Sequence, residues 1–117
     1  MHLCSACVFN TCSLSNKLNK LHQLLYCEKY DVICVTETWL HDGITCSLLD
    51  PNSTYTILRK DRVASHGSGV AVFVGRHLHF VEVIVSEPYM DLELLCFDLL
   101  MSTCKLRFFN HISTSIP

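Results

Sequence analysis

Two polar residues stand directly after apolar segments, where functional sites often form. Asn10 follows residues 3–9, and Glu37 follows residues 31–36. Parallel strands of one open α/β sheet end at a shared edge, and ligands bind at that edge. A carboxylate beside an amide can hold a hard divalent cation and a phosphate group. From spacing alone, a turn residue at Asn10 and a solvated strand end at Glu37 explain the same pattern more simply.

The elements expected to position these residues form a strand–helix–strand unit. Residues 3–9 are predicted as a short strand, and residues 31–36 are apolar on both faces, as in a buried parallel strand. Between them lies a helix that ends near Glu28, with Ser13 or Ser15 as its N-cap. Its apolar face is made of leucines at helical spacing, namely Leu14, Leu18, Leu21 and Leu25. The order predicts a right-handed βαβ unit with parallel strands that are neighbours or nearly so.

The second half of the chain has the pattern of a series of strands. Short apolar segments recur there with little sequence between them, which favours antiparallel hairpins. The expected strands are 54–60, 69–75, 79–85, 92–99 and 104–109. The turn into the second of these contains Gly67 and Gly69.

Composition narrows the classes of protein and partner. Half the residues are hydrophobic, which excludes a disordered tail. Lys and Arg number 9 and Asp and Glu number 11, so the chain has no excess of positive charge. Any binding of nucleic acid must therefore come from a local site or a bound cation. No apolar run approaches the length of about 18 residues that a membrane span requires. We expect a protein of the nucleus or cytoplasm, not secreted, with reduced cysteines.

The eight cysteines and seven histidines offer a second kind of site. Cys4 and Cys7 have the spacing of half a zinc knuckle, and Cys12 and His22 lie nearby in sequence, but no second pair follows. Residues 77–79 (HLH) place two imidazoles on one face if that segment is extended. A small Cys/His metal-binding interaction module therefore stands as an alternative function.

Three sequence words occur in the order found in one protein family. They are residues 9–18 (FNTCSLSNKL), residues 30–40 (YDVICVTETWL), and residues 59–62 (RKDR) followed by 67–72 (GSGVAV). Together they resemble the endonuclease/exonuclease/phosphatase family. The chain is most similar in these words to the N-terminal half of the endonuclease domain of non-LTR (LINE-type, jockey-like) retrotransposons. The Glu-Thr-Trp-Leu word after a buried strand is the most specific of the three.

The resemblance implies a fold and a set of roles. The expected fold is the N-terminal half of a four-layer α/β sandwich, a βαβ start followed by mostly antiparallel strands, with residues 1–110 as a partial domain and residues 111–117 as a divergent tail. Glu37 corresponds to the metal ligand for Mg²⁺, and Asn10 to an asparagine that contacts the metal site and the scissile phosphate of DNA. The glycines of residues 67–69 correspond to structural positions.

The match is incomplete in ways that concern catalysis. The chain contains no Ser-Asp-His word, and its one Asp-x-Asn word, residues 50–52, precedes the third expected strand. Cys12 stands where the family usually has Arg, and Ser68 where it has Gly. We therefore expect a truncated, inactive Mg²⁺-dependent DNA endonuclease domain with weak or lost metal binding, which self-associates through an exposed sheet face. An active divalent-metal nuclease, completed by a partner or by a residual site, is the alternative.

Two basic residues in the third word have two interpretations. Arg59 and Arg62 are either phosphate contacts or, more commonly for such positions, an exposed basic strand end.

Overall fold

The first sheet holds the two polar residues singled out above. In this computed structural model, which describes residues 4–61, 69–83, 94–101 and 104–111, the sheet has four strands in the order β1-β2-β4-β3. Their bounds are β1 Ala6–Asn10, β2 Val32–Thr36, β3 Tyr55–Lys60 and β4 Val70–Gly75. The predicted strands agree closely with these. β1 and β2 are parallel neighbours, as the βαβ prediction requires, and the other pairs are antiparallel.

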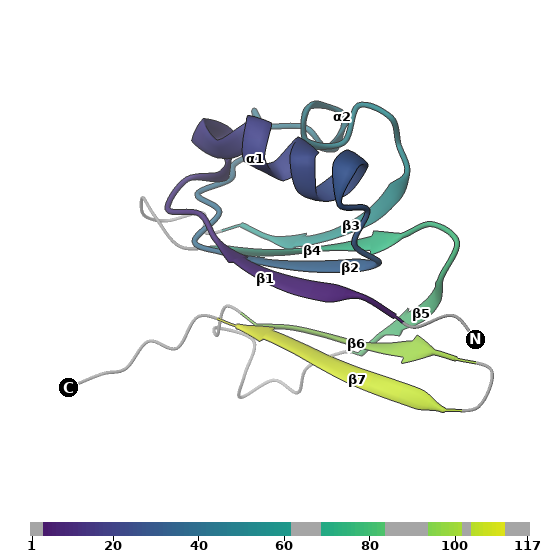
Figure 1. Cartoon of the computed structure of the whole chain (residues 1–117). Coiled ribbons are helices and arrows are strands. Elements are labelled where there is room, and N and C mark those ends of the chain that lie inside the picture. Colours follow the sequence, from purple (N-terminus) through teal and green to yellow (C-terminus); the bar gives the residue numbers. More distant parts are fainter. Residues whose placement is uncertain (1–3, 62–68, 84–93, 102–103, 112–117) are drawn as a thin grey trace.

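A continuous helical segment covers one face of this sheet (Figure 1). It consists of a 3₁₀ turn η1 (Leu14–Lys17), α1 (Leu18–His22) and a π turn η2 (Gln23–Cys27). The predicted leucine face packs on the sheet, since three of its members are buried: Leu14, Leu21 and Leu25. With the sheet residues beneath, such as Ile33 and Phe73, they form the helix-side core.

The predicted N-cap position is confirmed at Ser13, although its side chain does not cap the helix. Ser13 occupies the N-cap position, but its φ is 99° and its side chain makes no capping hydrogen bond. The Ser13 hydroxyl lies 3.3 Å from that of Ser15 instead. The reason is that the backbone N–H of Ser13 donates to the carbonyl oxygen of Glu37 at 2.9 Å, which fixes the chain in this conformation.

A short second helix, α2 (Cys46–Leu49), was not predicted. Thr45 caps it, accepting a hydrogen bond from the backbone N–H of Leu48 at 3.3 Å. Leu49 is its single buried residue, and one apolar position is too little to show helical periodicity in a sequence.

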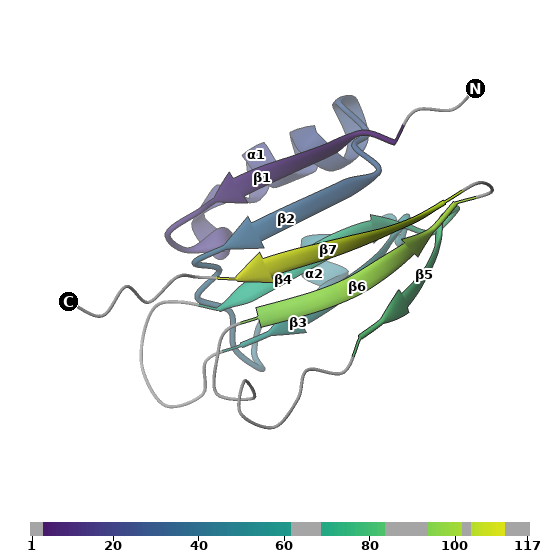
Figure 2. The same ribbon diagram turned by 90° about the horizontal axis from the view of Figure 1, so that it is seen from below.

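The second sheet packs on the other face of the first, so the described residues form three layers (Figures 1 and 2). Its strands have the order β5-β6-β7 and are antiparallel, as predicted. Their bounds are β5 His79–Glu82, β6 Leu94–Leu100 and β7 Lys105–His111. The predicted ends of β5 at 84–85 and of β6 at 92–93 lie outside the described residues. The mixed α/β sandwich expected from the sequence is confirmed.

The core between the sheets, called here the inter-sheet core, is aromatic at its centre. Phe97 of β6 is fully buried. Its ring stacks on Phe108 at a centroid distance of 4.9 Å and meets Phe80 edge-on at 6.1 Å. The first sheet supplies small β-branched residues to this core, including Val32, Val70, Val72 and Val74.

Asn110 joins the two sheets by hydrogen bonds. It lies on β7 and is 4% exposed. Its side-chain amide donates to the carbonyl oxygens of Val35 on β2 and Ala71 on β4, at 3.1 and 3.0 Å. Buried backbone carbonyls need partners, so this amide both satisfies them and fixes where β7 crosses the first sheet.

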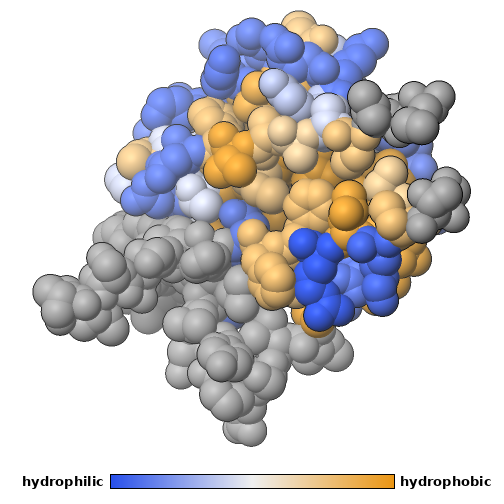
Figure 3. Space-filling view, turned by 60° about the horizontal axis from the view of Figure 1, so that its bottom comes forward, coloured by the Kyte–Doolittle hydropathy of each residue, from blue (hydrophilic) through white to orange (hydrophobic). Residues whose placement is uncertain are grey.

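The second sheet leaves β1 uncovered. Alternate residues of β1 pack on the helix-side core, whereas Val8 points to the opposite face and is 77% exposed. On β7, Phe109 is 62% exposed, and within the described residues β7 pairs with β6 alone. Figure 3 shows apolar side chains gathered on this side of the molecule. None of the helices in the described part of the chain is long and apolar enough to cross a membrane.

Candidate functional site

The structure brings Asn10 and Glu37 to one edge of the first sheet. β1 and β2 run parallel with Asn10 opposite Thr36, so both strands end together. The Cys12 sulfur lies between the two side chains, 3.7 Å from Asn10 Oδ1 and 3.5 Å from Glu37 Oε2. We call these three residues the donor edge. Asn10 and Cys12 are exposed and Glu37 is half-buried, so a ligand from solvent can reach all three.

Hydrogen bonds between the two strand exits hold the donor edge in shape. The carbonyl oxygen of Glu37 accepts from the Thr11 hydroxyl and from the Ser13 N–H, both at 2.9 Å. Thr11 is buried, and its own N–H donates to the Thr36 carbonyl at 3.1 Å. The backbone of Glu37 takes a φ of 53°, in the left-handed region that L-residues seldom adopt. The carboxylate is therefore positioned by a fixed backbone.

Charge at the donor edge comes from few groups. The hydrogen bond that Cys12 donates to Glu37 raises the pKa of the thiol, and burial and the carboxylate charge add to this. The Lys17 ammonium acts in the opposite direction. It donates to the Thr11 carbonyl at 2.9 Å, so it is held beside the edge.

Gly69 supports the donor edge from the neighbouring strand. It has a φ of +97° and precedes β4, while the rest of the predicted glycine turn, including Gly67, lies outside the described residues. Its carbonyl accepts from the Thr38 N–H at 3.2 Å. A Cβ at this position would come within 2.6 Å of the Thr38 hydroxyl oxygen. Both facts explain glycine here without any contact to phosphate.

Neither interpretation of Arg59 holds. Its guanidinium binds both carboxylate oxygens of Asp61, at 3.1 and 2.6 Å, and donates to the carbonyl oxygens of Ile44 and His41 at 2.7 and 3.1 Å. The side chain is 18% exposed, so it is neither a free basic strand end nor available to phosphate. It anchors the loop before α2 instead. Arg62 lies outside the described residues.

The Cys/His candidates do not converge on one point. Cys4 packs against the inter-sheet core and Cys7 against the helix-side core, so they lie on opposite faces of the first sheet. His22 Nε2 lies 3.0 Å from the Leu49 carbonyl oxygen. His77 precedes β5 and its Nε2 contacts Asp31 Oδ1 at 3.0 Å. Among the residues described, no three His, Cys, Asp or Glu side chains gather as a metal site would require.

Comparison with known proteins was made by sequence and by structure. No protein-family model matches the chain, and no curated protein matches it. An AP endonuclease from Leishmania major matches with a TM-score of 0.70 over 92% of this chain and 39% of its own, at 20% identity. An AP endonuclease from Archaeoglobus fulgidus gives 0.62 over 90% and 40%, at 17% identity. A Neisseria 3′ phosphatase bound to a product DNA hairpin gives 0.62 over 90% and 40%, at 15% identity.

The fold is that of the endonuclease/exonuclease/phosphatase proteins. This chain has part of that fold, since it spans about two fifths of the length of the solved structures it matches. At these identities the likeness establishes the arrangement of helices and strands.

Proteins with the endonuclease/exonuclease/phosphatase fold generally depend on a divalent metal ion. The donor edge fits such an ion in its oxygen chemistry: the Glu37 carboxylate and the Asn10 amide oxygen are both hard donors. Magnesium often uses one or two carboxylates and completes its shell with water and substrate oxygens. The donor edge supplies one carboxylate, the smallest number that magnesium sites commonly use.

The Asp-x-Asn word at residues 50–52 is structural in this fold. Asp50 is 2% exposed and accepts from the Tyr55 N–H at 2.8 Å and from the Tyr26 hydroxyl. Both carboxylate oxygens are therefore engaged at the far end of the sheet from the donor edge. The prediction that this word does not replace the family's catalytic one agrees with this placement.

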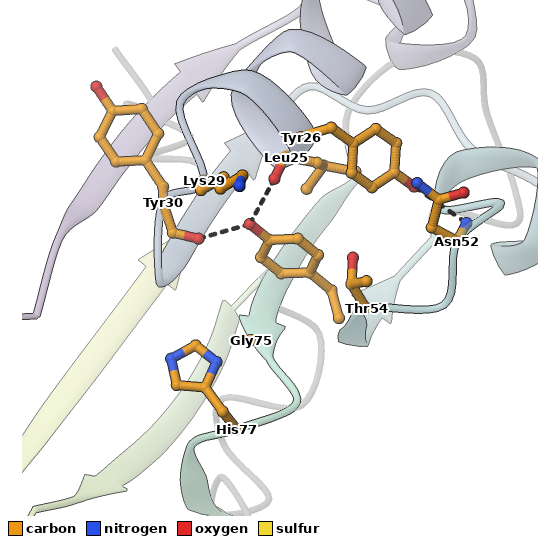
Figure 4. A pocket seen from close by; sticks show the side chains of 9 residues that line it. Leu25, Tyr26, Lys29, Tyr30, Asn52, Thr54, Gly75 and His77 are labelled. Atoms are coloured by element: carbon orange, nitrogen blue, oxygen red, sulfur yellow. Dashed lines mark hydrogen bonds between the residues drawn. The ribbon is translucent and has the colours of Figure 1, made fainter.

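A pocket of about 380 Å³ opens at that far end (Figure 4). Tyr55 is one of its lining residues, with its hydroxyl 2.7 Å from the Tyr30 carbonyl oxygen and 3.0 Å from that of Leu25. Lys29 and His77 also line it. The Tyr55 hydroxyl is used to tie the end of the helical segment to β3, so the pocket owes its shape to a structural contact.

The buried Tyr55 hydroxyl predicts a loss of stability at alkaline pH. Burial, with smaller effects of nearby acidic groups, raises the pKa of Tyr55 to about 12, above the value of about 10 in unfolded chains. A pKa raised on folding stabilises the fold below the unfolded pKa, and the stabilisation is lost as pH rises towards the folded one. Tyr55→Phe should cost about 1 kcal/mol at neutral pH but remove this contribution to the alkaline loss.

Urea unfolding at pH 7, 9 and 11, followed by circular dichroism, measures the effect. The stability gap between the chain and Tyr55→Phe should narrow at pH 11. A gap that stays constant across the three pH values would contradict the assignment.

Proposed function

We propose that this chain is a DNA-directed phosphodiesterase domain of the retrotransposon-endonuclease type that retains a partial metal site and does not cleave DNA by itself. The donor edge is the observation that carries the proposal. Glu37, Asn10 and the loop between them stand at the carboxyl ends of two parallel strands, where this sheet architecture binds ligands. The solved structures with the same fold include two AP endonucleases and a phosphatase bound to DNA.

The residues of the edge would divide the work of binding a phosphodiester. Glu37 would hold Mg²⁺. When bound, this ion would neutralise negative charge on the phosphate. The Asn10 amide can donate to a phosphate oxygen through its nitrogen while its oxygen faces the ion. Both side chains belong to strand ends whose backbone is fixed by the Thr11 and Ser13 hydrogen bonds. Binding therefore costs little backbone conformational entropy.

Catalysis requires groups that the described part of the chain does not bring to this edge. Hydrolysis needs something to orient or deprotonate water and something to stabilise the charge that grows on phosphate. The edge offers one carboxylate, one amide and one thiol, and the Lys17 ammonium beside it is bound to the Thr11 carbonyl oxygen. Asp50 is engaged elsewhere, and the sequence has no Ser-Asp-His word. These are the grounds on which we propose an inactive domain.

The Glu-Thr-Trp-Leu word supports the retrotransposon-endonuclease type. Two of its residues are needed for packing. Thr38 is buried behind Gly69, and Leu40 lies in the helix-side core. Glu37 and Trp39, which is 46% exposed, both have positive φ values of 53° and face the surface. The word thus combines two buried residues, Thr38 and Leu40, with Glu37 at the donor edge and an exposed Trp39.

Nicking of supercoiled plasmid in Mg²⁺ tests the proposal. We expect no nicking, together with weak Mg²⁺-dependent binding of a DNA duplex that is lost in Glu37→Ala, measured by fluorescence anisotropy. Glu28→Ala, which removes an exposed carboxylate at the end of the helical segment, is the matched control and should bind like the unchanged chain. Binding unaffected by Glu37→Ala would contradict the metal role.

The alternative is an active nuclease. Nicking by the chain and by Glu28→Ala, but not by Glu37→Ala, would establish a working metal site and overturn the proposal of inactivity.

We also propose that the chain self-associates through the uncovered side of the sandwich. Large apolar side chains are exposed there on three strands: Val8 on β1, Val81 on β5 and Phe109 on β7. Exposed apolar surface beside a strand edge with unpaired backbone groups favours contact with another copy.

A further inference from the structure

The Cys12 thiol approaches two oxygen acceptors although it has one proton to donate. Its sulfur lies 3.5 Å from Glu37 Oε2 and 3.7 Å from Asn10 Oδ1. The proton can serve one of them, so the other contact is sulfur against an oxygen lone pair. A cation placed among the three atoms would satisfy all of them at once, because each atom is a metal donor in proteins.

The spacing of these atoms suits one ion. In a tetrahedral zinc site, with Zn–S near 2.3 Å and Zn–O near 2.0 Å, sulfur and oxygen ligands lie about 3.5 Å apart. Cys12 is at that separation from Glu37 and slightly beyond it from Asn10. The exposure of Asn10 and Cys12 leaves the remaining coordination positions to water.

We propose that Cys12 gives the donor edge a preference for a thiophilic divalent cation of the zinc class over Mg²⁺. This rests on the proposed function, in which the edge is a metal site, and adds what selects the metal. Thiolate ligands favour zinc and related ions, whereas magnesium requires oxygen. On binding, the thiol proton passes to solvent, and the thiolate and the Glu37 carboxylate together neutralise the dication.

Cobalt and cadmium serve as spectroscopic probes because their bonds to thiolate absorb light by charge transfer. The fully reduced whole chain is titrated anaerobically with Co²⁺ or Cd²⁺, with Mg²⁺ present in large excess. We expect one equivalent to bind with a thiolate band. In Cys12→Ser the band should disappear and the affinity fall at least about tenfold, since loss of groups around a metal site commonly costs 10–100-fold.

Cys104→Ser is the matched control. Cys104 is also exposed but lies between β6 and β7, away from the donor edge. It should bind like the unchanged chain, and Glu37→Gln should weaken binding while keeping the band. A band that survives in Cys12→Ser, or that falls equally in Cys104→Ser, overturns the proposal.

A gain-of-preference variant separates this inference from the proposed function. Cys12→Asp replaces sulfur by carboxylate oxygens at the same edge, so Mg²⁺ should now displace bound Co²⁺. Unchanged metal preference in Cys12→Asp contradicts a selecting role for sulfur, even if Glu37→Ala has shown that the edge binds metal. The Glu37→Ala variant tests whether the edge binds metal at all, which is the proposed function. The Cys12 variants test which metal the edge prefers.

Discussion

Phe97→Ala should lower the free energy of unfolding by about 3–5 kcal/mol, the range for large aromatic truncations in protein cores. Phe97 is fully buried between the sheets, stacked on Phe108 and in edge contact with Phe80. Removing its ring leaves a cavity that the surrounding strands close only in part. Since domains are stable by roughly 5–15 kcal/mol, the variant should be close to unfolding in native buffer. Chemical denaturation followed by circular dichroism measures the loss.

Phe109→Ala is the control with the same chemical change on the same sheet. Phe109 is 62% exposed on β7, so its truncation should change stability by less than about 0.5 kcal/mol. If the uncovered side mediates self-association, this variant should also elute later in size-exclusion chromatography. Equal destabilisation by the two substitutions would contradict the packing described for the inter-sheet core, and an unchanged monomeric elution of both chains would contradict self-association.

Asn110→Asp should cost about 3–5 kcal/mol at neutral pH, as expected for a buried charge without a partner. The substitution removes the amide donor and places a carboxylate against the carbonyl oxygens of Val35 and Ala71. The charged form is disfavoured by burial and by these oxygens, so the pKa of the introduced carboxyl should rise above its ordinary value of about 3.9. A carboxyl pKa raised on folding makes the deficit shrink as pH falls.

Two control variants separate the effect of the buried charge from other effects of the substitution. Asn110→Ala, which loses the donor without adding charge, should cost about 1–3 kcal/mol with little dependence on pH. Asn19→Asp makes the same chemical change at an exposed position of α1 and should be nearly neutral. Urea midpoints at pH 4.5 and 7.5 for the three variants test the order. A pH-independent deficit in Asn110→Asp would show that the side chain is not buried between the sheets.

The sequence predicts the strands well for a physical reason. β2 is buried on both faces, with Val32 and Cys34 in the inter-sheet core and Ile33 and Val35 in the helix-side core. A strand in that position shows as an unbroken apolar run. The Leu14–Leu25 face shows helical spacing for the same reason, because one side of the helix packs on the sheet. α2, with a single buried leucine, carries no such signal.

The candidate site was harder to anticipate because it depends on side chains that periodicity does not describe. Parallel strands predict that Asn10 and Glu37 lie near each other, and the structure places them at one edge. The position of Cys12 between them follows from positive φ values at Cys12 and Ser13, which no local pattern predicts. Arg59 was misjudged because its partners, His41 and Ile44, precede it by 15 or more residues and are bound through backbone oxygens.

The order of the strands has a consequence for synthesis on the ribosome. Within the described residues, every strand of the first sheet comes from positions up to Gly75, and every strand of the second from His79 onwards. The first sheet and its helices can therefore assemble while β6 and β7 are still untranslated. At translation rates of about 5–20 residues per second, the valines of β2 and β4 face water for a few seconds before Phe97 and Asn110 emerge. Nascent-chain chaperones should bind in that interval, and release should follow the arrival of β7.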